Sequence, residues 1–73
     1  MNNLNISTVR DFFSKGGESL WIPTITRNAI IADEGFSSRP CTSVQGRVYL
    51  FHFKSIGGGM WEVTLRNLDG SER

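Results

Sequence analysis

This chain nearly lacks the residues that cross-link small proteins. Its 73 residues include a single cysteine, Cys41, and a single histidine, His52. One cysteine cannot close a disulfide within the chain, and the two residues together fall short of the four ligands of a usual structural zinc site. The sequence therefore predicts no metal or cofactor, and a fold that is stabilised by packing or partly by a partner.

Excess charge and long apolar runs are also missing. Eight basic residues against seven acidic ones give a net charge of +1, and no two basic residues are adjacent. Because nucleic-acid-binding domains usually carry a basic stripe, this pattern gives no support to DNA or RNA as the primary partner. The longest apolar run, residues 29–32, is too short to span a membrane, and the chain starts without the basic and apolar stretches of a signal peptide. We expect a cytoplasmic protein without membrane contact.

The length allows only a modest core. Seventy-three residues make one domain, which we expect to span residues 1–73 as a monomer, with flexible ends at 1–6 and 68–73. Ordering a chain costs roughly 1.5 kcal/mol per residue, and apolar burial must offset nearly all of that cost. With 38% hydrophobic residues, the chain needs most of its large apolar side chains for packing.

The stretch STVRDFFSKGG predicts a helix of about two turns over residues 8–15. Ser7 or Thr8 can cap its start, and two glycines end it. A helix this short is not stable alone, so it must dock through an apolar face. The spacing of three and four residues gives that face three members, which are Val9, Phe12 and Phe13.

The next segment has two possible structures. LWIPTI is rich in strand formers, and Pro23 indicates an edge strand because proline cannot donate to a ladder. Residues 24–34 form either a helix that Thr24 caps and Gly35 closes, or a strand, NAIIAD, paired with LWIPTI. The β-branched residues favour the strand, and AIIAD is the best candidate for a third strand of a sheet.

Residues 37–45, SSRPCTSVQ, have no periodic apolar face and predict a loop. Cys41 lies in this segment without a local base, and we interpret it as an inert, partly buried thiol. Asp33 and Glu34 are sequence neighbours that would point to opposite faces of a strand, so they are a poor acid–base pair. No set of nucleophile, base and orienting residue can be assembled, and we expect no enzymatic activity.

The clearest element is a hairpin in GRVYLFHFKSIGGGMWEVTLRN. A three-residue turn of glycines 57–59, a common hairpin connection, places Phe51 opposite Leu65 and Phe53 opposite Val63. All bulky apolar groups then share one face, whereas a two-glycine turn would place the aromatic residues opposite charged ones. We therefore predict the first register, with a core face made of Tyr49, Phe51, Phe53, Trp61, Val63 and Leu65.

The other face of the hairpin is polar in this register. Lys54 lies opposite Glu62, and His52 lies opposite a threonine. Val48 and Leu50 also point to this side, where they are either covered by the second part of the chain or form a recognition patch. Together these elements predict an α+β fold, with one short N-terminal helix packed on an antiparallel sheet of three to four strands.

Two classes of binding function follow from this fold. One is protein recognition, in which a face or a sheet edge docks on a larger partner. The other is a small winged-helix-like DNA-binding protein with KSIGGGM as its wing. The recognition helix would then fall on FSSRPCTSVQG, which holds one arginine and a proline and so offers few base-reading side chains. We therefore favour protein recognition, with nucleic-acid contact as secondary.

The whole chain, from MNNLNISTVRDFF to LDGSER, resembles in length and character the compact single-domain proteins that lytic phages make to take over host machinery. Among these it is most similar to the transcription regulators of Xanthomonas phages. The resemblance implies a protein in the host cytoplasm that binds bacterial RNA polymerase, inhibits initiation at promoters and promotes read-through of terminators. It transfers no functional residue by position.

The candidate partner-binding residues therefore come from the elements themselves. Three residues precede the helix with nothing local to hold them, one arginine projects from the helix, and four side chains lie on the polar face of the hairpin. Arginine at a desolvated centre can anchor an interface. The eight candidates are Asn2, Asn3, Leu4, Arg10, His52, Lys54, Glu62 and Arg66.

Overall fold

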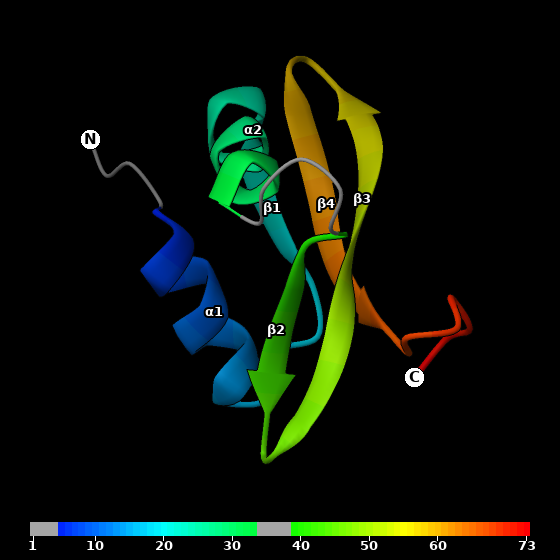
Figure 1. The fold of residues 1–73 in the computed structure, drawn as a ribbon. Helices are drawn as coiled ribbons and strands as arrows, with labels where there is room; N and C mark the ends of the chain where they lie inside the picture. Colours follow the sequence, from blue (N-terminus) through cyan, green and yellow to red (C-terminus); the bar gives the residue numbers. More distant parts are fainter. Residues whose placement is uncertain (1–4, 34–38) are drawn as a thin grey trace.

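Two helices and four strands make up the part of the chain that the computed structural model describes, residues 5–33 and 39–73. In chain order they are α1 Ile6–Ser14, β1 Leu20–Pro23, α2 Thr24–Asp33, β2 Cys41–Val44, β3 Arg47–Gly57 and β4 Met60–Arg66. The strands pair antiparallel in the sheet order β1-β4-β3-β2. Both helices lie on one face of this sheet (Figure 1). The predicted α+β fold, a short N-terminal helix packed on a small antiparallel sheet, is confirmed.

Helix α1 begins two residues before its predicted start. The Oδ1 atom of Asn5 accepts a hydrogen bond from the Thr8 backbone N–H at 2.8 Å, so Asn5 is the N-cap. Asparagine caps at least as well as serine or threonine, and the prediction that Ser7 or Thr8 is the cap is wrong. At the other end, a Cβ at Gly17 would overlap the Phe12 ring, so this close approach requires a glycine.

Residues 24–33 form helix α2, and the strand interpretation of NAIIAD is wrong. The Thr24 N–H donates to the Gly59 carbonyl at 3.0 Å, and by the alternation of an antiparallel ladder the Pro23 nitrogen points to the outer edge of β1. Proline cannot donate to a further strand there, whereas a helix satisfies its own backbone groups. The buried residues of α2, four positions apart, are Thr26 and Ile30.

Strand β2 lies within the segment predicted as a loop, residues 37–45, and that prediction is wrong for Cys41–Val44. Thr42 and Val44 are buried while the residue between them is exposed, which is the period of a strand. The segment is short and mostly polar, so its sequence does not show this period. Gln45 and Gly46, with φ of 52° and 81°, form the two-residue turn to β3 that such positive angles favour.

The predicted register of the β3–β4 hairpin is confirmed. Its pairs are Phe51–Leu65 and Phe53–Val63 on one face, and His52–Thr64 and Lys54–Glu62 on the other. The turn itself is tighter than predicted, because Gly57 pairs with Met60 and an irregularity between Ser55 and Gly57 takes up the extra residue. All three glycines of the tip have positive φ, a conformation that costs glycine least.

The core lies between the sheet and the two helices. The rings of Phe13 and Phe51 join helix to sheet, with centroids 6.0 Å apart, as predicted for this side of α1. The side chains with no exposed surface come from both helices and from strands β1 and β4, and are Val9, Phe13, Ile22, Ile30 and Val63. Tyr49, Phe53 and Trp61 are partly buried and pack against this cluster.

The two outward-pointing apolar residues of β3 have different environments. Leu50 is buried, whereas Val48 is 48% exposed. Helix α2 does not cover them, because it lies on the opposite face of the sheet (Figure 1). In the sheet, Leu50 lies between Cys41 and Arg66.

Candidate functional site

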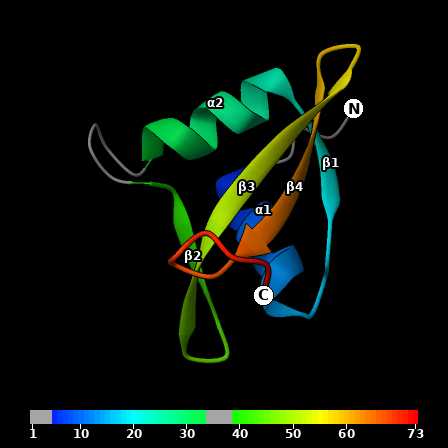
Figure 2. The ribbon, with the colours of Figure 1, turned by 90° about the vertical axis from the view of Figure 1, so that its right-hand side faces the viewer.

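In the described part of the chain, one face of the sheet carries no helix, and we call it the open face (Figure 2). Across three of its strands, β1, β4 and β3, Trp21 pairs with Glu62, and Glu62 pairs with Lys54. His52 and Thr64 form the next pair. Alternation along β3 and β4 gives these side chains their common face, since their sequence neighbours point into the core.

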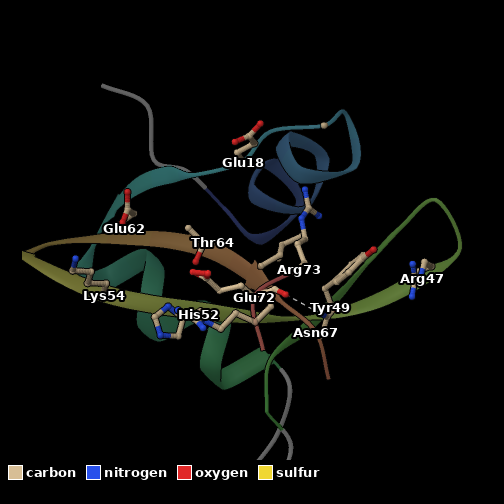
Figure 3. A pocket seen from close by; sticks show the side chains of 13 residues that line it. Glu18, Arg47, Tyr49, His52, Lys54, Glu62, Thr64, Asn67, Glu72 and Arg73 are labelled. Carbon is tan, nitrogen blue, oxygen red and sulfur yellow. Dashed lines mark hydrogen bonds between the residues drawn. The ribbon is translucent and has the colours of Figure 1, made fainter. Parts of the chain in front are cut away.

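A groove open to solvent, of about 1030 Å³, runs over the open face. Figure 3 shows Lys54 and Glu62 at one end, and Tyr49 and Arg47 at the other. The connection between α1 and β1 lines one side of the groove through Glu18. Other side chains that line the groove are those of His52, Thr64, Arg66, Glu72 and Arg73.

The C-terminal residues fold back against this groove, although we expected residues 68–73 to be a flexible end. Asn67 donates its backbone N–H to the Ser71 carbonyl at 2.9 Å and its side-chain amide to the Glu72 carbonyl at 3.0 Å. Glu72 forms an antiparallel bridge with Arg66 of β4. We call residues 67–73 the C-terminal turn.

Hydrogen bonds from Ser71 organise the tip of this turn. The Ser71 hydroxyl and backbone N–H donate to Oδ1 of Asp69 at 2.6 and 2.9 Å. These two bonds stabilise the charged carboxylate and lower the pKa of Asp69 below its ordinary value of 3.8, with the hydroxyl as the larger cause.

Both outer edges of the sheet are obstructed. On β1, the backbone positions that face outward are Trp21 and Pro23, and Pro23 has no N–H to donate. On β2, Nη2 of Arg10 donates to the Cys41 carbonyl at 3.3 Å, and Arg10 also forms an ion pair with Asp33 at 3.4 Å. Prolines and charged side chains at such edges oppose the addition of another strand. The open face is therefore the better surface for recognition.

The structure brings together four of the eight predicted partner-binding residues. His52, Lys54, Glu62 and Arg66 all line the groove. Arg10 lies elsewhere, where its contacts link α1 to α2 and β2. The remaining three candidates, residues 2–4, lie outside the described part of the chain.

Sequence reasoning missed Trp21, which is 63% exposed on the open face. Leu20 and Ile22 point toward the core, so the alternation of β1 places the tryptophan on the other side. That alternation was visible in LWIP, and it would have identified the residue. An exposed tryptophan is unusual because this side chain is highly buried on average.

The described residues also bear on the other candidate chemistries. Among residues 5–33 and 39–73, no three side chains of His, Cys, Asp or Glu come together as a group that could hold a metal ion. Cys41 is partly buried and its thiol lies 3.1 Å from the Arg39 carbonyl. Residues 41–44, where a winged-helix protein would need its recognition helix, form a strand. Within the described ranges, no helix has the length and apolarity needed to cross a membrane.

No family model matches this chain, and neither a curated protein nor a solved structure is detectably similar to it.

Proposed function

We propose that this protein is a non-enzymatic module that binds another protein through its open face. The observation that carries the proposal is Trp21, a large apolar side chain 63% exposed beside the cross-strand pair of Glu62 and Lys54. Tryptophan is enriched among the residues that contribute most to protein interfaces. The obstructed sheet edges support docking through the face instead of by strand addition.

The proposed partner is a large complex of the host cell, bacterial RNA polymerase. The support for this choice is the resemblance of the chain to small phage transcription regulators. On this proposal the protein inhibits initiation at promoters and promotes read-through of terminators. The mixed charge of the groove favours a protein surface, which also presents both signs of charge, over the uniform charge of a DNA backbone.

The direct test is binding to purified host RNA polymerase holoenzyme, measured by biolayer interferometry with the immobilised protein. We expect wild type to bind, and Trp21→Ala to weaken binding by at least about 30-fold, since truncating such an anchor costs about 2 kcal/mol or more. Ile25→Ala is the matched control, because Ile25 is 75% exposed but lies on α2, away from the open face. Circular dichroism would check that both variants stay folded.

Two outcomes would contradict the proposal. If the polymerase binds Trp21→Ala as well as wild type, the open face is not the docking surface. If wild type does not bind the polymerase and instead binds random duplex DNA tightly with a steep salt dependence, the DNA-binding alternative replaces it. An in vitro transcription assay on a template with a promoter and a terminator would test both proposed effects on the polymerase.

A further inference from the structure

The arginine side chains of the groove are gathered at one end of it. Arg47 begins β3, Arg66 ends β4, and Arg73 belongs to the C-terminal turn. At the other end, Lys54 is accompanied by Glu62 (Figure 3). The groove therefore has a cationic end, which we define by Arg47, Arg66 and Arg73.

Arg66 is incompletely paired at this end. Its Nη1 donates to the Gly70 carbonyl at 3.4 Å, which is a long bond. Its Nε–H is buried and has no hydrogen-bond partner within residues 5–33 and 39–73. A guanidinium prefers two parallel bonds to a carboxylate, and a single carbonyl oxygen cannot supply both. Arg66 thus retains donor capacity, and a carboxylate could use the buried Nε–H once the side chain moves outward.

The other members of the cationic end are exposed side chains. Arg73 lies over the Tyr49 ring, with 5.1 Å between the guanidinium carbon and the ring centroid. The ring face offers no conventional hydrogen-bond acceptor, so this contact does not use the N–H donors of the guanidinium. Arg47 is exposed beside Tyr49 on β3. Three guanidinium groups outnumber the two nearby carboxylates, Glu72 in the groove and Asp69 in the hollow beside Arg47, and so favour an anion.

We infer that the cationic end binds an acidic segment of the partner protein, with an Asp or Glu carboxylate on Arg66. This inference rests on the proposed function and names the chemistry of its partner. The inference of an acidic peptide rests on charge complementarity. The three carboxylates of the groove argue against nucleic acid as the ligand. Glu18, Glu62 and Glu72 would repel a continuous phosphate backbone, whereas a peptide places its negative charge only at chosen positions.

The experiment is an NMR titration of the ¹⁵N-labelled full chain with an acetylated octapeptide of alternating Glu and Gly. We expect saturable shifts of the Arg66 Nε–Hε signal and of the backbone signals of Arg47 and Arg73, with a dissociation constant on the order of 1 mM. The shifts should weaken as salt is added. The same peptide with Gln in place of Glu should leave these signals unchanged.

Matched variants locate the site. Arg66→Gln should weaken binding of the Glu peptide at least about fivefold. Arg66→Lys should retain part of the affinity, because lysine keeps the positive charge but lacks the parallel N–H donors of a guanidinium. Arg39→Gln is the control, since Arg39 is exposed and outside the groove. The dispersion of each variant's spectrum reports whether it is folded.

Three results would overturn the inference: no shift at the cationic end, equal shifts with the Gln peptide, or stronger binding there of an oligothymidylate of the same length. The outcomes separate it from the proposed function. If the Glu peptide fails while polymerase binding still depends on Trp21, only the acidic partner segment is wrong. If the Glu peptide binds at Arg66 and the polymerase does not bind, the site stands and the proposed partner is wrong.

Discussion

The two faces of the same sheet differ in almost every physical property. On the covered face, Val63 and Leu65 are buried under the helices. On the open face, the residues that alternate with them along β4, Glu62 and Thr64, are polar and only half-buried. One strand thus supplies the core and the candidate binding surface in alternation.

A chain of this size can thus hold its fold with one set of side chains and keep another set for the proposed partner. Packing uses mainly every second side chain along β3 and β4, and of the other set Leu50 is also buried, while its polar members are partly or fully exposed. Substitutions on the covered face should therefore change the free energy of unfolding, whereas those on the open face should change binding. The predictions below test that division, in order of decreasing effect.

The largest effect is expected from Phe51→Ala on the covered face. The Phe51 ring is buried and lies against both Phe13 and Phe53, so its removal leaves a cavity and should cost roughly 3–5 kcal/mol. That is enough to unfold a marginal domain of this size. Urea denaturation followed by tryptophan fluorescence would measure it, with Val48→Ala on the half-exposed side as the control. A Phe51→Ala protein as stable as its parent would mean that the packing between sheet and helices is wrong.

A smaller loss of stability is expected from Thr24→Val, at the residue where helix α2 begins and contacts the tip of the hairpin. The Thr24 hydroxyl donates to the Gly59 carbonyl at 3.0 Å and accepts from Nε1 of Trp61 at 2.9 Å. Valine removes both bonds at almost constant volume and leaves the indole N–H without its acceptor, which should cost about 1–3 kcal/mol.

A double-mutant cycle would show how much of that loss comes from the bond between Thr24 and Trp61. In a Trp61→Phe background the indole N–H is absent, so Thr24→Val should then cost less than in wild type. Equal costs in the two backgrounds would show that the hydroxyl does not dock α2 to the sheet through Trp61.

The same division between faces explains how far the sequence could predict the fold. In β3 and β4 each face has its own chemistry, so a shift of one residue would have placed Phe53 opposite Glu62, and only one register separates the faces. The hairpin was therefore predictable. The hairpin tip was less predictable, because three adjacent glycines are compatible with several turn types. No side chain determines which glycine pairs across the strands.

Segments whose pattern does not separate two faces were predicted wrongly. The β-branched residues of α2 favour a strand locally, but Pro23 and the contact of Thr24 with the hairpin tip impose a helix, so tertiary contacts override local preference. In β2 the buried position Thr42 is polar, and it gives no hydrophobic signal. The groove could be predicted only in part, since its wall from Glu72 and Arg73 depends on how the C-terminal turn folds back.

On the open face, Arg66→Ala should leave the domain folded. Arg66 is half-buried and its one bond to the Gly70 carbonyl is long, so we expect a change within about 1 kcal/mol. Thermal denaturation beside Phe51→Ala measures the contrast between the faces. A loss as large as that of Phe51→Ala would mean that the open face also holds the fold together.

The smallest effect concerns the C-terminal turn, which borders the open face without belonging to the sheet. The bonds from Ser71 lower the folded pKa of Asp69. They therefore stabilise the turn fully above the unfolded pKa of 3.8, and their contribution is lost as the pH falls through the lower folded pKa.

Ser71→Ala removes the hydroxyl, the larger cause, and should raise the pKa of Asp69 toward its ordinary value. Carbon-detected NMR titration of the Asp69 carboxyl in both proteins would measure the shift, with Asp11, which lies on α1, as the internal reference. If Asp69 titrates identically in the two proteins, the hydroxyl does not hold its carboxylate, and other bonds of the turn, such as those of Asn67 and Arg66, set the wall that it gives the groove.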